Sequence, residues 1–331
     1  MDGELSRIVA DQHGFFYRWQ ALDCGNSAKE IEALLRTGDW VRVRRGAYTT
    51  KALMESLDDS GRHVLRIRAV TGNLSGLVVV TGTSALAVRR VPLWDVDLKI
   101  VHVAREQGFT SRTDADVVHH VTHVPDCQLV EVDGLLVTGM ERSVVDAARR
   151  VSFESGVVLA DGARRLAPFD GDLAQSILAS QRDWPGSVKA SRVLRFSDGA
   201  AETVGESRSR VMIARIGLPA PQLQRCIYRS DGSLLARTDF FFEEFKTVGE
   251  FDGKQKYGRS LYEKNGRIEE VDLGEVVWQE KRREDAIRDE GNEMVRWVWF
   301  EVHGRDDEMR KRFQRAFDRA DRRRPSTRAG G

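Results

Sequence analysis

Three acidic residues in the C-terminal half are spaced as ligands of a single metal ion. Asp239 precedes a run of three phenylalanines, and Glu250 and Asp252 stand two residues apart in the next apolar segment. In a β-strand, side chains two apart point to one face with Cα atoms roughly 6.6 Å apart, so Asp239 on a neighbouring strand can join the other two. Carboxylates this close repel by up to about 4 kcal/mol per pair at an effective dielectric near 20. The spacing therefore predicts a cation between these three residues.

The expected cation is Mg²⁺ or Mn²⁺, because oxygen-only ligands favour these ions over Zn²⁺. Such an ion polarises a phosphoryl oxygen, activates a water and offsets charge on the leaving oxygen. Lys254, two residues after Asp252, would place an ammonium beside the attacking water or the scissile phosphate. These residue types predict metal-dependent phosphodiester hydrolysis.

A simpler interpretation of the same pattern is a hairpin turn, because Asp-Gly is the strongest dipeptide signal for one. The segment 131–134 repeats Glu-x-Asp-Gly between apolar residues with no lysine after it, and we interpret that copy as a turn only. The later copy differs because Asp239 lies upstream, Lys254 lies downstream, and Glu206 precedes both on a helix. That helix is indicated by the apolar spacing of residues 211–216 and ends at Gly217.

An acidic helix residue followed by Asp and then by Glu-x-Asp or Asp-x-Lys is the order of the PD-(D/E)xK nuclease superfamily. Residues 204–302 resemble its branch related to the very-short-patch-repair endonuclease, through 217–221, 250–257, 280–285 and 295–299. The resemblance implies a restriction-endonuclease-like α/β sandwich with a DNA contact at Arg283. Most other charged residues of 280–288 are explained by i,i+4 ion pairs on a solvent-exposed helix. The catalytic residues it implies are Glu206, Asp239, Glu250, Asp252 and Lys254. Thr238 replaces the signature proline, and whether Glu250 or Asp252 is the second motif acid stays open.

The first 51 residues predict a winged helix-turn-helix. Apolar residues from Phe15 to Leu22 have near-helical spacing, and Ser27 with Glu30 forms a capping box for a second helix that Gly38 ends. Residues 40–48 then alternate apolar and basic side chains, with a turn near 45–46.

In this geometry the helix from Ala28 to Thr37 would lie in the major groove, with Lys29 at base edges or phosphates. The wing arginines Arg42, Arg44 and Arg45 would contact the DNA backbone or minor groove. Two alternatives to DNA binding stay open. In the first, the winged helix binds another protein. In the second, the arginines only protect an exposed strand edge.

This segment resembles the N-terminal domain of AbiEi-type antitoxins. The matching positions are Ala21-Leu22, Gly25, Ser27, Trp40, Arg42, Arg44-Arg45-Gly46 and Tyr48, with a looser likeness to about residue 165. Those antitoxins are DNA-binding repressors paired with a nucleotidyltransferase toxin. Since this chain continues into a nuclease-like region, a separate toxin partner and a homodimer both stay open.

The middle region, 52–200, predicts the least chemistry. His119, His120, His123 and Cys127 invite a zinc interpretation, but a strand over 117–124 would put His119 and His123 about 13 Å apart. Structural zinc requires closer ligands, so we expect none there. Asp146 and Asp161 lie in helical apolar patterns and are expected at the surface or as caps.

A chain of 331 residues with 41% hydrophobic content is expected to form two or three domains. The predicted class is α/β, α+β overall: a winged helix at 1–51, a mixed α/β domain with a linker at 52–200, the nuclease-like domain at 201–304 and a basic helix and tail at 305–331. No apolar run approaches the roughly 20 residues of a membrane span. Three scattered cysteines indicate a reducing cytoplasm.

The combined expectation is a cytoplasmic DNA-binding protein with Mg²⁺-dependent endonuclease activity, in phage defence or a toxin–antitoxin-like system. Two alternatives stay open. One is a non-enzymatic transcriptional repressor that keeps a degenerate nuclease fold. The other is a nuclease or toxin directed at RNA.

Overall fold

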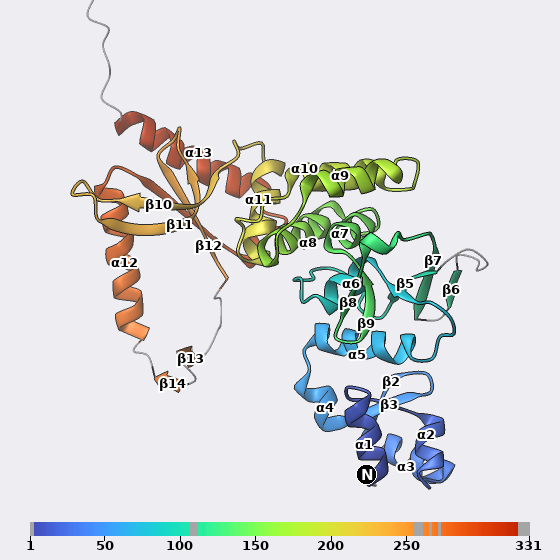
Figure 1. Ribbon diagram of the computed structural model, residues 1–331. Coiled ribbons are helices and arrows are strands. Elements are labelled where there is room, and N and C mark those ends of the chain that lie inside the picture. The colour runs from blue at the N-terminus through green and yellow to red at the C-terminus, as the bar shows by residue number, and fades with distance from the viewer. Residues whose placement is uncertain are drawn as a thin grey trace, which may run out of the picture. The chain divides into compact units, whose positions relative to one another are not determined.

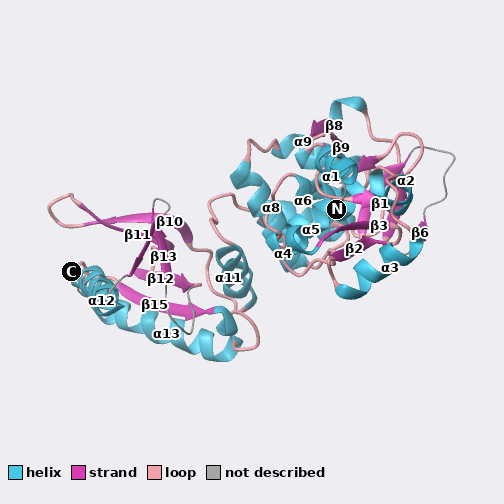
Figure 2. Ribbon diagram, turned by 90° about the horizontal axis from the view of Figure 1, so that it is seen from below, coloured by secondary structure: helices cyan, strands magenta, loops and turns pink. Residues whose placement is uncertain are grey.

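The computed structural model of the chain describes residues 3–105, 112–114, 116–253, 261–264, 267–270 and 273–323 (Figure 1). The chain divides into two units, Met1–Ser197 and Asp198–Gly331. The first holds the winged part together with the middle region, and the second holds the acidic residues. Mixed sheets with helices on their faces confirm the predicted α+β class (Figure 2).

The N-terminal part of the first unit is built on a three-stranded antiparallel sheet of order β1-β3-β2. Its core contains Leu5, Phe16, Ile31, Trp40 and Tyr48. In chain order its elements are α1 (Gly3–Asp11), β1 (Phe16–Tyr17), α2 (Arg18–Asp23), α3 (Ala28–Thr37), β2 (Trp40–Arg44) and β3 (Ala47–Thr50). This helical pair with a following hairpin has the arrangement that the sequence predicted.

The second of the two predicted helices is confirmed in detail. The Ser27 hydroxyl accepts from Glu30 N at 3.2 Å, the Glu30 carboxylate accepts from Ser27 N at 2.7 Å, and Gly38 ends α3 with φ of 84°. The first helix was predicted too early, because Phe16 and Tyr17 form β1. The chain turns into α2 at Arg18, where the Gln20 side chain accepts from Tyr17 N at 2.7 Å.

The middle region contains a six-stranded sheet of order β6-β7-β5-β4-β9-β8, in which β5 and β7 are parallel. The strands are β4 (Val79–Val80), β5 (Val101–Arg105), β6 (Arg112–Asp114), β7 (Val117–Val121), β8 (Leu129–Val132) and β9 (Leu135–Thr138), with a short 3-10 turn η1 (Asp126–Gln128). The helices are α4 (Lys51–Ser56), α5 (Asp59–Thr71), α6 (Gly82–Val88), α7 (Met140–Ala148), α8 (Phe153–Leu166), α9 (Gly171–Ser180) and α10 (Ser187–Phe196). Asp133 and Gly134 form the β8–β9 turn with φ of 48° and 74°, which confirms the interpretation of the first Glu-x-Asp-Gly copy as a hairpin.

The expectation that Asp146 and Asp161 lie at the surface was wrong. Asp146 is 3% exposed and Asp161 is fully buried. Helices α7 and α8 are covered on nearly all sides, since residues 142–148 and 155–163 are all buried. Apolar periodicity describes one helix face only, so it could not show that the polar face of each helix is buried as well.

The second unit has a four-stranded sheet of order β10-β11-β12-β15, in which β12 and β15 are parallel and the other pairs antiparallel. Its strands are β10 (Gln222–Tyr228), β11 (Leu234–Phe242), β12 (Thr247–Asp252) and β15 (Glu293–Val298), beside a small hairpin of β13 (Leu261–Lys264) and β14 (Arg267–Glu270). Its helices are α11 (Val204–Arg215), α12 (Leu273–Asp289) and α13 (Asp306–Arg323), with a 3-10 turn η2 (Trp299–Glu301).

Both faces of this sheet are covered. Ile287 of α12 packs with Phe241, Val248 and Met294 on one face. Residues of α11 and α13 pack on the other face with Phe240 and Trp297, and the cluster includes Met212, Met309, Phe313 and Phe317. The predicted C-terminal amphipathic helix is therefore confirmed, and it completes the core of the acidic unit. In the described part of the chain, no helix is both long and apolar enough to cross a membrane.

Candidate active site

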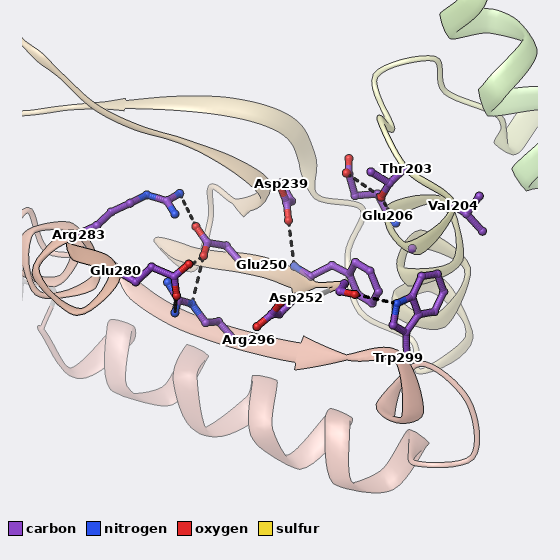
Figure 3. A pocket seen from close by; sticks show the side chains of 13 residues that line it. Thr203, Val204, Glu206, Asp239, Glu250, Asp252, Glu280, Arg283, Arg296 and Trp299 are labelled. Atoms are coloured by element: carbon purple, nitrogen blue, oxygen red, sulfur yellow. Dashed lines mark hydrogen bonds and ion pairs between the residues drawn. The ribbon is translucent and has the colours of Figure 1, made fainter. Parts of the chain in front are cut away.

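The acidic residues of the second unit line a cleft of about 570 Å³. The pairing of Phe240 with Gly249 leaves Asp239 of β11 beside Glu250 of β12, on the sheet face that α12 covers further along (Figure 3). The lining residues are Thr203, Val204, Gly205, Glu206, Asp239, Glu250, Phe251, Asp252, Gly253, Glu280, Arg283, Arg296 and Trp299.

Asp239 is held by the backbone of the neighbouring strand. Its Oδ2 accepts a hydrogen bond from Phe251 N at 3.0 Å. Burial raises the pKa of Asp239, and the negative charge of Glu250 adds to this effect, while the Phe251 hydrogen bond and the charge of Arg283 oppose it. The carboxylate is thus costly to ionise here, and a cation beside it would lower that cost.

Glu250 lies between two arginines. Arg283 Nη2 donates to Oε1 at 2.6 Å, and Arg296 Nε donates to Oε2 at 3.1 Å (Figure 3). Arg283 comes from α12, and Arg296 comes from β15, where it is the register partner of Glu250. Burial still raises the pKa of Glu250, although both guanidinium groups lower it.

Arg296 is a site residue that the sequence analysis missed. It is a charged residue in an otherwise largely apolar strand, Glu293–Val298, which is the signal that could have marked it. Its guanidinium also lies 3.6 Å from Glu280 and 3.8 Å from Glu284 of α12, so it links the parallel strand to the helix above the cleft.

Glu206 lines the same cleft from the first turn of α11, and it is 5% exposed. Both of its carboxylate oxygens accept hydrogen bonds, from Thr203 Oγ1 at 2.9 Å, Glu202 N at 2.9 Å and Gln224 Nε2 at 2.8 Å. Burial raises the pKa of Glu206, and the charge of Asp239 contributes. This carboxylate therefore positions the start of α11 beside Asp239.

Asp252 is exposed at the end of β12 and completes the group of four described acidic residues that line the cleft from the expected positions. Lys254, the expected lysine, falls outside the described residues. Among the side chains that the structure describes, no three His, Cys, Asp or Glu residues are gathered tightly enough to enclose a metal ion. The described acids share a cleft without forming a preformed cage.

The expected DNA contacts of the first unit fall into two groups. Lys29 at the start of α3 and Arg42 and Arg45 of the wing are exposed. Arg44 instead donates Nε and Nη2 to the two carboxylate oxygens of Asp116, at 3.1 and 3.0 Å. Its guanidinium therefore links the wing to the middle region. The sequence pattern did not indicate this structural role.

Comparison with known proteins supports the N-terminal resemblance. Residues 4–51 match the AbiEi_4 family, described as "Transcriptional regulator, AbiEi antitoxin". Two similar proteins are the uncharacterized proteins MT2308 and Rv2248 from two strains of Mycobacterium tuberculosis. Each is 30% identical over 229 residues, which cover 68% of this chain and 78% of the relative. The expected likeness of residues 204–302 to very-short-patch-repair endonucleases stays a prediction.

Proposed function

The chain belongs to the family of Rv2248 and MT2308 and begins with an AbiEi-type transcriptional-regulator domain, and on this premise we propose that it binds DNA and cleaves phosphodiester bonds at its acidic cleft with Mg²⁺ or Mn²⁺. DNA binding follows from the regulator domain at residues 4–51. The exposed side chains of Lys29, Arg42 and Arg45 supply its positive charge. Cleavage is the further step.

The observation that carries the cleavage proposal is the juxtaposition of Asp239 and Glu250 in one cleft. Both carboxylates, and that of Glu206 beside them, have pKa values raised by burial. A group of acids that is costly to ionise is stabilised in its charged form by a bound cation. The order of the acids, from α11 to β11 to β12, is also the order of the nuclease superfamily that the sequence resembles.

The donor set suits a hard divalent ion, because it consists of carboxylate oxygens. Asp239 and Glu250 would hold the ion, with Asp252 beside them. When bound, such an ion activates water and stabilises charge on phosphoryl oxygens. Arg283 and Arg296 bracket Glu250, and an ion that binds Glu250 would compete with their positive charges for this carboxylate. Arg283 is 36% exposed and is the partner better placed to turn toward a DNA phosphate.

A nuclease assay tests this proposal. Duplex, single-stranded and mismatched DNA and labelled RNA are incubated with the protein in Mg²⁺, Mn²⁺ or chelator. We expect DNA cleavage that needs the metal and falls at least about 100-fold in Asp239→Asn, the order seen when one electrostatic contact of a preorganised site is lost. Asp231→Asn is the matched control, because Asp231 is exposed in the β10–β11 turn. Lys254→Ala tests the lysine. Nicking that is equal in all variants and independent of metal would refute the proposal.

A second candidate is a DNA-binding repressor whose C-terminal unit does not cleave. The observation that favours it is the pairing of both Glu250 oxygens with arginines, which supplies internally the positive charge that a metal would bring. This function expects a gel shift on the chain's own promoter that is lost in an Arg42→Ala/Arg45→Ala variant, together with no Mg²⁺ binding by calorimetry.

A further inference from the structure

The middle region of the first unit contains two adjoining hollows that the proposed function does not use. They have volumes of about 380 Å³ and 180 Å³, and His120, Asp146 and Arg150 line both. The larger one has apolar walls that include Val96, Ile100, Val118, Ala147 and Val151. A hollow with apolar walls and a few convergent polar groups is typical of a small-molecule site.

Arg150 sets the proton positions of two histidines in this site. A guanidinium can only donate, so Arg150 Nη2, 3.1 Å from His120 Nδ1, makes that nitrogen an acceptor. His120 then carries its proton on Nε2, which lies 3.0 Å from His102 Nδ1. His102 therefore bears its proton on Nε2. Burial, with the charge of Arg150, lowers the pKa of His102 to about 4 and that of His120 to about 3, so both rings are neutral.

Two buried polar atoms at the site lack a protein partner among the described residues. The Thr83 hydroxyl lines the larger hollow, and it is buried with no hydrogen bond. Arg149 lines the smaller hollow, and its Nε is likewise buried and unpaired. Buried polar groups without partners are rare in folded proteins, and a ligand that supplies those partners explains them.

The charge at the smaller hollow is positive. Arg142 and Arg149 pair with the single carboxylate of Asp146, and Arg150 donates to the Asp146 backbone carbonyl. Arg149 also lies over the Trp184 ring with its Cζ 4.7 Å from the centroid. Gly186 permits this arrangement, because a Cβ there would collide with the Arg149 carbonyl. Planar guanidinium groups in excess over carboxylates suit phosphate.

The larger hollow has the opposite polarity at its rim. Asp95 and Asp97 line it together with His102 and Thr83. A phosphate would be repelled by these carboxylates, whereas hydroxyl and amino groups could donate to them. The two hollows together thus offer an anion site beside a polar, partly apolar chamber.

We propose that these hollows bind one small phosphate ester of mononucleotide size, with its phosphate against Arg149 and Arg150 and its body beside Thr83 and His102. The ligand supplies an acceptor to His102 Nε2–H and donors to the aspartates of the rim. This site lies in the first unit, outside the matched regulator domain, and is independent of cleavage at the acidic cleft.

The test is calorimetry on the full-length protein with three probes: adenosine 5′-monophosphate, adenosine and inorganic phosphate. We expect one binding site for the monophosphate, with inorganic phosphate and adenosine each at least about tenfold weaker, since each lacks half of the contacts. Arg150→Met and Thr83→Val should each weaken the monophosphate about tenfold or more. Arg192→Met is the matched control, because that arginine contacts Phe153 in the same unit, away from both hollows.

Thr83→Val also separates a binding effect from a folding defect. It removes a buried hydroxyl that has no partner, so the unliganded variant should unfold at the same temperature as the parent or higher. Absence of binding by the parent would overturn the proposal, as would equal affinity for inorganic phosphate and the monophosphate. Unchanged affinity in both Arg150→Met and Thr83→Val would overturn it too.

Discussion

The acidic cleft and the smaller, arginine-lined hollow have opposite charge balances. In the cleft, arginines from α12 and β15 reach Glu250 from outside the acidic pair, and Arg283 remains partly exposed. In the smaller hollow, the buried Asp146 carboxylate pairs with Arg142 of its own helix and with Arg149 just after it, and Arg150 donates to the Asp146 backbone carbonyl. The charged groups of the cleft can therefore exchange partners with solvent species, whereas Asp146 is locked into the fold.

Asp146→Ala should destabilise the first unit strongly. The carboxylate accepts from Arg142 Nε at 2.9 Å, Thr81 Oγ1 at 3.0 Å and Gln181 Nε2 at 3.0 Å, and its loss leaves buried guanidinium charge without compensation. We expect a loss of about 3–5 kcal/mol in the free energy of unfolding of the first unit. Chemical denaturation followed by circular dichroism measures it. A loss below about 1 kcal/mol, the value of an exposed ion pair, would show that Asp146 is not locked.

The sequence pattern predicted that the acidic residues of the cleft lie together, but it did not predict the residues around the hollows, for a physical reason. Glu250 and Asp252 are two residues apart, so strand periodicity alone places them together. His102 and His120 meet only because β5 and β7 pair in parallel, and Arg150 joins them from the end of α7. Local rules for caps, turns and amphipathic helices likewise predicted α3, the Asp133–Gly134 turn and α13. They could not predict that Arg44 pairs with Asp116, which is 72 residues away in the chain.

Arg283→Gln should change the affinity of the cleft for a divalent ion. The variant removes the 2.6 Å contact to Glu250 Oε1 while Arg296 keeps its own contact. If a metal ion and Arg283 compete for Glu250, the variant should bind Mn²⁺ more tightly, by several-fold, and should lose little stability because Arg283 is partly exposed. Calorimetric titration with Mn²⁺ measures the change. Weaker or unchanged Mn²⁺ binding would mean that Arg283 is not a competitor.

The free energy of unfolding of the second unit should depend weakly on pH. Burial raises the pKa of Glu206, Asp239 and Glu250, so the folded second unit holds protons that the unfolded chain has already released. Its stability should therefore fall as pH rises from about 4, the ordinary range of carboxyl groups, toward neutrality. We expect a change below about 1 kcal/mol, because the cleft is open to solvent.

Thermal unfolding across this pH range, with and without Mg²⁺, measures that dependence. Mg²⁺ should reduce the pH dependence of stability in the parent protein. It should leave the pH dependence of Asp239→Asn unchanged. Stability that instead rises toward neutral pH without metal would mean that the cleft's arginines already satisfy its carboxylates.

A Mn²⁺ titration of the parent protein, Asp239→Asn and Asp231→Asn measures whether Asp239 and Glu250 together hold a divalent cation, as we propose. We expect one Mn²⁺ site in the parent and in Asp231→Asn, and loss of that site in Asp239→Asn. A parent protein that takes up no Mn²⁺, or an Asp239→Asn variant that binds it as well as the parent, would contradict the claim and leave the DNA-binding repressor as the function.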